Sequence, residues 1–459
     1  MNFPSATILT INGAATVNGT VNGATGILKT NKNPSVIDGN GTINSKVTIQ
    51  QPTSIAATAN ITTTAIVTLA NTLTITSGGI LTATEIDSNA KTVANNGTVN
   101  LSGNYLRTGG TAIWTQGANS VLNIGGAFTP AANITLNASA SGNTINYNGA
   151  SQTPDTALYA NLIFSGSGTV SIVNGVSVSG NLSIAPAGSV VASIGSGLNI
   201  SVGTLTTGGL GTINGTWGST ASAAANQEDA YFAATTGMLS VATDTRGAQA
   251  ALTAVAMPAT VVYGSTSMLS STGGSGTGTV TFSVGASTGC SITGGTTLNV
   301  IDAGGTCSVT ATKAGDKHYN QAISAALPVT LIKKNITVAA SASSKIYGEA
   351  DPAFTYVSSD VSATFSGALS RAAGETPGVY VMTIGSLAVV GNNYNIATFV
   401  PADFTIFAAP TAALSLNHPG NMNTGTRLGY IVSRQDQYGN PTSASSMVVY
   451  LQSSSTSTA

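Results

Sequence analysis

Residues 176–184 read VSVSGNLSI. In this stretch apolar and polar side chains alternate with a period of two, which is the pattern of a β-strand with one face buried and one face in solvent. The same alternation recurs in TVNLS (98–102), NITLN (133–137) and TINYN (144–148), each bounded by Gly or Asn. Apolar residues seldom return at a spacing of three or four, so the pattern predicts an all-β protein.

The runs between residue 6 and about residue 242 are short and separated by polar loops. Stacked coils of a β-solenoid explain such runs, because each coil contributes short strands with apolar residues inside and Thr, Ser or Asn outside. The spacing is too irregular to number the coils. We therefore predict an N-terminal β-solenoid over residues 1–245, followed by small β-sandwich or Ig-like modules.

Charge is scarce along the whole chain. The 459 residues include 14 Lys and Arg, 15 Asp and Glu, and a net charge of −1. Charged residues make up 6% of the chain, against about a quarter in ordinary soluble proteins. This composition excludes nucleic-acid binding through a basic patch, and it is typical of repetitive extracellular β-structure rather than of an enzyme.

The cysteines Cys290 and Cys307 lie 17 positions apart, with no His or further Cys at the spacing of zinc ligands. We favour a disulfide between them, which requires an oxidising compartment and suits an exported protein. The alternative is a complete cytosolic protein with two free thiols. No signal peptide and no membrane-spanning run are visible, and we expect the sequence to be a fragment of a longer exported chain, secreted or on a bacterial cell surface.

After a connector near residues 244–251 the residue pattern changes, because Tyr and Lys now occur among the alternating residues. Two units share a Tyr-Gly element near their start, at Tyr263-Gly264 and at Tyr347-Gly348. We predict that these tyrosines are structural corner residues with a buried ring and a bonded hydroxyl. The predicted domains are 246–333, 334–407 and a truncated sandwich at 408–459.

Three of these segments resemble known families. The segment from Val261 to Asn320 resembles a bacterial Ig-like repeat of large secreted proteins, and the resemblance implies that Cys290 and Cys307 pair across neighbouring strands. It also implies that the turn from Asp316 to Tyr319 packs the last hairpin. The tail with DQYGNPT (436–442) resembles the Ig-like repeats of invasin-type proteins.

The segment 335–407, with SKIYGEADPAFTY and NNYNIATFVPADFTI, resembles MBG domains of the YGx type, which occur in giant bacterial adhesins. It departs from the family pattern only at residues 358–362, where a longer polar loop is common. The N-terminal half resembles the β-strand repeats of such adhesins. None of these resemblances carries a catalytic residue to this chain.

The sequence contains few candidates for catalytic or metal-binding residues. The histidines His318 and His418 are expected to be surface residues. We expect Trp114 and Trp217 to be core residues or coil caps rather than platforms for sugar stacking. Two acid pairs, Glu85 with Asp87 and Glu228 with Asp229, would suit a glycosidase only with basic or aromatic substrate contacts nearby, which the sequence does not offer. No cofactor or metal is predicted. Calcium at the turns 38–41 and 436–440 is a weak alternative to turn formation.

The leading hypothesis is thus a non-enzymatic, exported bacterial surface or matrix protein of the adhesin type, with a glycan, a host or matrix surface, or other cells as partner. A second hypothesis is that the solenoid binds a glycan or ice through a Thr and Asn face, built from runs such as 61–64 and 72–76, with Thr63→Lys as its test. A polysaccharide-active β-helix enzyme is the weakest of the three.

Overall fold

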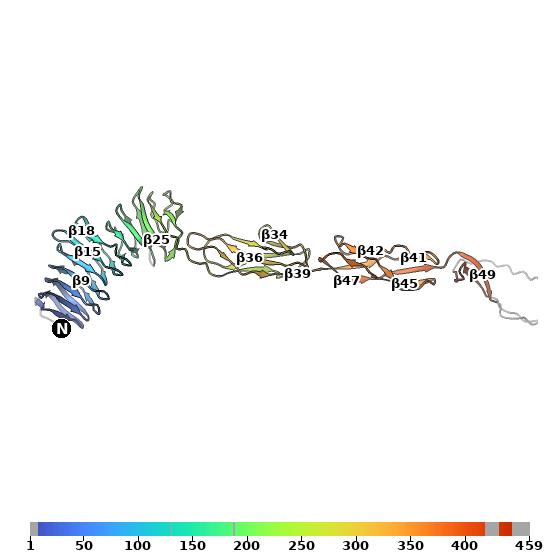
Figure 1. Ribbon diagram of the computed structural model, residues 1–459, viewed down its shortest axis with the longest axis horizontal. Coiled ribbons are helices and arrows are strands. Elements are labelled where there is room, and N and C mark those ends of the chain that lie inside the picture. Colours follow the sequence, from blue (N-terminus) through green and yellow to red (C-terminus); the bar gives the residue numbers. More distant parts are fainter. Residues whose placement is uncertain (1–7, 130, 187–188, 418–430, 443–459) are drawn as a thin grey trace, which may run out of the picture. The chain divides into compact units, whose positions relative to one another are not determined.

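The alternating runs form the rungs of a parallel β-solenoid in the computed structural model, which describes residues 8–129, 131–186, 189–417 and 431–442 (Figure 1). The solenoid has about nine turns, and small, mostly antiparallel sheets follow it along the chain. Apart from a 3-10 turn at Ala131–Asn133, the described chain contains no helix. The prediction of an all-β fold with an N-terminal solenoid is confirmed.

Two long sheets build the solenoid. The first contains β1 (Ile8–Ile11), β3 (Gly19–Thr30), β5 (Asn40–Ile49), β7 (Asn60–Thr63), β8 (Val67–Leu69), β10 (Ile80–Ala83), β11 (Ile86–Asp87), β13 (Thr98–Leu101), β14 (Tyr105–Leu106), β16 (Val121–Ile124), β17 (Phe128–Thr129), β19 (Thr144–Tyr147), β20 (Leu158–Tyr159), β21 (Asn161–Phe164), β23 (Ser177–Ile184), β25 (Asn199–Thr207), β26 (Leu210–Gly211), β27 (Gly215–Gly218), β28 (Asn226–Gln227) and β29 (Met238–Val241). The second contains β2 (Ala14–Thr16), β4 (Ser35–Asp38), β6 (Thr53–Ile55), β9 (Leu73–Ile75), β12 (Thr92–Asn95), β15 (Ala112–Gln116) and β18 (Ile134–Asn137). A short pair, β22 (Thr169–Ile172) and β24 (Val191–Ile194), completes it.

The core of the solenoid is a set of stacked apolar columns. One column contains, in order, Ile61, Leu81, Val99, Leu122, Ile145, Leu162, Leu182 and Leu205, each buried and each in register with the next. Successive members are 17 residues apart at Ile145 to Leu162 and 23 apart at Leu182 to Leu205. Coils of unequal length explain why the repeat could not be numbered from the sequence.

Both tryptophans lie in this core, as expected. Trp114 on β15 is fully buried, contacts Tyr105 and Phe128 edge-on, and donates its indole N–H to Gln116 Oε1 at 2.8 Å. Trp217 on β27 is also fully buried, and its indole N–H bonds the Ile213 carbonyl at 2.9 Å. Each ring contributes apolar area while its polar atom stays paired.

The described chain divides into two compact units. The first contains the residues up to Ala251 together with Gly273–Thr279 and Lys313–Ala322; the second contains Leu252–Thr272, Val280–Thr312 and the chain from Ile323. Two loops of the predicted Ig-like segment thus belong to the same unit as the solenoid. The domain boundaries drawn from the sequence stay predictions.

The second unit consists of small sheets. Its strands are β30 (Leu252–Met257), β31 (Thr260–Val262), β32 (Thr266–Gly273), β33 (Val280–Ser283), β34 (Cys290–Thr293), β35 (Thr297–Val300), β36 (Ser308–Lys313), β37 (Ala322–Ile323), β38 (Leu327–Pro328), β39 (Thr330–Ile332), β40 (Lys334–Ala340), β41 (Ser343–Ile346), β42 (Tyr356–Ser358), β43 (Phe365–Ser366), β44 (Ser370–Arg371), β45 (Gly378–Thr383), β46 (Ala388–Val389), β47 (Tyr394–Val400), β48 (Asp403–Phe407), β49 (Thr411–Asn417) and β50 (Ile431–Asp436). Three of these strands, β32, β36 and β37, each include one residue that belongs to the first unit. Most pairs are antiparallel, but β31–β39, β40–β47 and β41–β48 are parallel.

Candidate functional site

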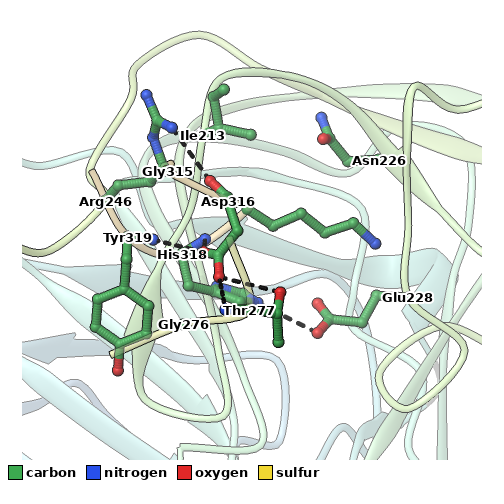
Figure 2. A pocket seen from close by; sticks show the side chains of 11 residues that line it. Ile213, Asn226, Glu228, Arg246, Gly276, Thr277, Gly315, Asp316, His318 and Tyr319 are labelled. Carbon is green, nitrogen blue, oxygen red and sulfur yellow. Dashed lines mark hydrogen bonds and ion pairs between the residues drawn. The ribbon is translucent and has the colours of Figure 1, made fainter. Parts of the chain in front are cut away.

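A cleft of about 700 Å³ lies in the first unit, where charged side chains gather (Figure 2). Three parts of the chain form it: the last turns of the solenoid, the connector at Arg246, and the two loops that belong to this unit. The residues around it are Ile213, Asn226, Glu228, Arg246, Gly276, Thr277, Gly315, Asp316, Lys317, His318 and Tyr319.

His318 lies between two acceptors. Its Nδ1 is 3.1 Å from the Gly211 carbonyl, and its Nε2 is 3.2 Å from Glu228 Oε1. A neutral imidazole can donate from only one nitrogen, so this arrangement favours the imidazolium form. The hydrogen bond to Glu228 accordingly raises the pKa of His318, against the opposing effect of burial. The other Glu228 oxygen accepts from Thr207 Oγ1 at 3.2 Å.

Asp316 organises the loop that carries His318. Its Oδ1 accepts the backbone N–H groups of His318 and Tyr319, both at 2.9 Å, and its Oδ2 accepts the N–H of Thr277 at 2.6 Å. Although burial by itself raises it, these hydrogen bonds bring the pKa of Asp316 below its ordinary value. The carboxylate therefore holds the two loops together. Asp316 to Tyr319 lie in the loop between the paired strands β36 and β37, and this loop belongs to the first unit. That they pack the last hairpin, as the resemblance implies, stays a prediction.

The cations of the cleft also have partners. Arg246 donates to the Asp244 carboxylate at 2.8 Å and to the Asp316 carbonyl at 3.1 Å, and Lys317 Nζ donates to the Gln227 carbonyl. Each charged side chain that lines the cleft is thus engaged by protein atoms. These contacts suit a structural role, in which the pair of His318 and Glu228, called the clasp below, fixes the loops on the solenoid. Catalysis would need an acid, base or nucleophile directed at a substrate.

The sequence analysis expected His318 to be a surface residue, but its side chain is only 15% exposed. It is separated from Glu228 by 90 positions, so no local spacing could have shown the pair. His418 lies outside the described residues.

The acid pairs considered as glycosidase carboxylates accept hydrogen bonds from other parts of the protein. Asp87 accepts hydrogen bonds from Thr108 Oγ1 at 2.8 Å and from the Asn89 N–H at 3.1 Å, and Glu85 accepts a long one from Asn104. Asp229 accepts two from Thr220, at 2.7 and 2.8 Å, which lower its pKa. Each of these three acids therefore has a hydrogen-bond partner within the protein.

The turns considered for calcium are likewise occupied by donors. Asp38 Oδ1 accepts from the Gly39 N–H at 2.7 Å and Thr58 Oγ1 at 3.0 Å. Asp436 accepts from the N–H groups of Tyr438, Asn440 and Ala409 and from the Asn440 amide. Within the ranges that the structure describes, no group of three or more His, Cys, Asp and Glu is placed to hold a metal.

Cys290 and Cys307 form a disulfide, with Cα atoms 5.5 Å apart, in the core of the second unit. Cys290 begins β34, and Cys307 directly precedes β36. The bond joins two strands that belong to different sheets.

The two Tyr-Gly elements occupy equivalent places. Tyr263 follows β31 and its N–H bonds the Ile332 carbonyl at 2.8 Å; Tyr347 follows β41 and its N–H bonds the Phe407 carbonyl at 2.8 Å. In both cases the partner residue ends a strand that is parallel to the strand before the tyrosine. The following glycines have φ of +84° and +91°, which disfavours a side chain there.

The tyrosine rings are half-buried rather than fully buried as expected. Tyr263 packs edge-on against Tyr394 with ring centroids 5.3 Å apart, and Tyr347 packs against Tyr438 at 5.1 Å. Their role as corner residues remains an interpretation.

A group of four charged side chains in the second unit joins β41, which carries Lys345, to β44, which carries Arg371. Its two acids, Asp351 and Glu375, lie in the loops that follow β41 and β44. Lys345 Nζ is 2.7 Å from Asp351 and 2.5 Å from Glu375, and Arg371 bonds the same two carboxylates, 2.7 Å from Asp351. The Arg371 guanidinium also lies 5.0 Å from the ring centre of Phe404. The hydrogen bonds from Arg371 and Lys345 lower the pKa of Asp351, and those from Lys345 and Arg371 lower the pKa of Glu375.

Comparison with known proteins places this ion group inside a recognised domain. Residues 336–405 match the family model of the MBG domain (YGX type), a domain found in bacterial surface proteins. The match confirms the MBG resemblance for this segment. No curated protein and no solved structure matches the chain. In the part of the chain that the structure describes, no helix is long and apolar enough to cross a membrane.

Proposed function

We propose that this chain is a non-enzymatic, exported bacterial surface protein of the adhesin type, in which the solenoid presents an adhesive surface and the modules of the second unit bear load. The observation that supports it most is the MBG domain at 336–405, of a kind found in bacterial surface proteins, on the same chain as a long β-solenoid. The scarcity of charge suits an inert extracellular part, and the disulfide suits an oxidising location.

The parallel strand pairs supply a mechanism for bearing load. In the MBG segment, β40 pairs with β47 and β41 with β48, so a strand near the start of the domain lies parallel to one near its end. The segment 260–332 repeats this arrangement in β31 and β39. When the two ends of a domain are pulled apart, parallel terminal strands slide along each other. All hydrogen bonds of the pair then resist together instead of opening one by one.

Adhesion of the full chain tests the proposal. Beads that carry the whole protein through a C-terminal tag are presented to bacterial cells, extracellular matrix proteins and insoluble polysaccharides, with beads that carry an unrelated all-β protein as control. We expect attachment to at least one of these surfaces under flow. Attachment no better than that of the control on every surface contradicts the proposal.

A polysaccharide panel tests the non-enzymatic part. We expect no release of reducing ends or unsaturated sugars during long incubation. Release that Glu85→Gln or Asp87→Asn abolishes would show that the chain is an enzyme.

A further inference from the structure

The outer face of the first solenoid sheet contains a continuous ladder of polar side chains. Thr42, Thr62, Thr82, Asn100, Asn123 and Asn146 occupy matching positions on β5, β7, β10, β13, β16 and β19, and each is in register with the next. All six are half-buried and lie between inward-facing residues of the core. We call this row the ladder. Neighbouring positions are about 4.8 Å apart, the spacing of adjacent strands.

Hydrogen bonds fix the amide half of the ladder. Asn146 donates to Asn123 Oδ1 at 3.0 Å, Asn123 donates to Asn100 Oδ1 at 2.8 Å, and Asn100 donates to Thr82 Oγ1 at 3.2 Å. At the end of this row of hydrogen bonds, Ser165 donates to Asn146 Oδ1 at 2.8 Å. Every amide therefore points the same way along the stack. Their side-chain entropy is already lost before any ligand arrives, which lowers the cost of binding.

Each amide of the ladder keeps hydrogen-bonding capacity. An Asn side chain has two N–H donors and two acceptor lone pairs, and the ladder uses one of each at Asn100 and Asn123. At each of these two amides one donor and one acceptor are left that the ladder does not use. A hydroxyl group needs this combination, because it both donates and accepts.

A second row runs beside the ladder, two residues earlier on each strand. It contains Asn40, Asn60, Ile80, Thr98, Val121 and Thr144. Neither row contains a charged residue, and on β5 Lys46 lies beyond both rows, past the residues that pair with β7. The two rows form an uncharged lattice, in which neighbouring positions are one strand spacing apart along the stack and about 6.6 Å, two residues, apart along each strand.

From this face we infer that the ladder binds a neutral, hydroxyl-rich polymer, a polysaccharide chain or sheet that lies along the solenoid axis. The inference deepens the proposed function, on which it rests, by assigning its adhesive surface and ligand class. Charge complementarity supports a neutral ligand, because an uncharged face gives an ionic polymer no attraction to offset the loss of its hydration. Neither row offers an aromatic ring for stacking a single sugar, so affinity must come from many weak contacts repeated along a polymer.

Thr63, which the sequence pattern suggested as the position to test on such a face, does not lie on it. Thr63 is 3% exposed and points into the core, because adjacent residues of a strand face opposite sides. Thr62 is the ladder residue on the same strand.

The experiment measures co-sedimentation of the full chain with insoluble cellulose and β-1,3-glucan as neutral probes, and binding to immobilised alginate as a charged probe. Thr62→Lys adds a charge to the ladder, and Thr74→Lys is its matched control, an outward threonine on β9 of the other sheet. Asn123→Asp removes a ladder donor and adds a charge. Its control is Asn137→Asp on β18, where Asn137 donates to Thr115 across the other sheet. Thermal unfolding checks that all four variants fold.

We expect the unmodified chain to bind a neutral probe, and Thr62→Lys and Asn123→Asp each to weaken binding about tenfold or more, while the two controls stay within about twofold. Neutral-probe binding that the ladder variants leave unchanged overturns the assigned surface but leaves the proposed function standing. Binding to alginate alone, or slowed ice growth without polymer binding, overturns the ligand class. Failure of the beads described above on every surface removes the proposed function itself.

Discussion

In the solenoid, neighbouring coils are held by stacked apolar columns and uncharged side-chain ladders, whereas in the MBG segment four charged residues from two strands and two loops form one ion group. Lys345 on β41 contacts Asp351 and Glu375, and Arg371 contacts the same pair. In the solenoid, by contrast, Asn95 bonds Gln116 and the indole of Trp114 bonds the same Gln116, all within the core. A chain with few charges can therefore stabilise stacked coils through neutral polar pairs and place its ion pairs elsewhere, in the MBG segment and around the cleft.

This contrast follows from geometry. Each coil of a solenoid repeats the positions of the one before, so identical charges would stack about 4.8 Å apart and repel. Asn and Thr can stack because each both donates and accepts. A small sandwich has no such repetition, so opposite charges can be brought together from separate turns. The two units should thus respond differently to mutation, reduction and pH.

The largest effect is expected from the solenoid core. Trp114→Ala removes a fully buried ring that packs against Tyr105 and Phe128, and large-to-small changes of this kind cost about 3–5 kcal/mol. In denaturant unfolding monitored on the full chain, we expect the transition of the first unit to move to lower denaturant and that of the second to stay. Thr115→Ala, an outward neighbour on the same strand, is the control, and an equal shift in both transitions would contradict the division into units.

Removal of the disulfide should destabilise the second unit and leave the first unchanged. A double variant, Cys290→Ser with Cys307→Ser, opens a loop of 17 residues in the second unit and is expected to cost about 3 kcal/mol. We expect only the transition of the second unit to shift, with the same effect from a reducing agent on the unmodified chain. Persistence of the transition under reduction would show that the surrounding core alone sustains the unit.

The two units should also differ in their pH dependence above about pH 6.5, because only the first contains the His318 pair. In acid both units should lose stability, because carboxylates with lowered pKa values lie in each, such as Asp316 in the first unit and Asp351 in the second. The folded-state pKa of His318 is raised by Glu228, so the stability that the clasp contributes is fully present below the unfolded value of about 6.5 and is lost as the pH rises through the higher folded value. The folded-state pKa values of Asp351 and Glu375 are lowered, so their contribution is present above about 4 and is lost as the pH falls through the lower folded values.

Unfolding transitions recorded from pH 3 to 9 test this contrast. We expect His318→Gln to remove the slope that the first unit shows above about pH 6.5, and to cost about 1 kcal/mol at pH 6, where a charge-assisted hydrogen bond is lost. Lys345→Met should flatten the acid slope of the second unit. Slopes that the two variants leave unchanged would assign the pH dependence to other groups.

Much of the solenoid could be predicted because alternation alone determines which residues face inward. Leu73 and Ile75 are buried and Thr74 faces outward, as their period of two requires. The run Ile61-Thr-Thr-Thr64 was harder, since three consecutive threonines give no phase and a shift of one residue reverses the face. For this reason the sequence pattern alone led to the buried Thr63 as the position for the binding test.

The cleft could not be predicted for a different reason. Glu228 and His318 meet only because a loop after β36 returns to the solenoid, and nothing in the local sequence of either residue records that packing. The MBG segment was predictable from family resemblance, but its ion group was not, because Lys345, Arg371 and Glu375 come from different strands and turns. Long-range charge pairing is set by tertiary structure rather than by pattern.

The smallest effect is expected from calcium. A calcium site in a protein offers six to eight oxygen ligands, but both oxygens of Asp436 already accept N–H groups, at 2.8 to 3.0 Å. Bound calcium would have to displace these donors and leave backbone N–H groups unpaired. A ligand that does not bind the folded state cannot stabilise it, so millimolar calcium should leave both unfolding transitions unchanged. A calcium-dependent rise that Asp436→Asn abolishes would show that the tail gains ligands that the described residues do not include.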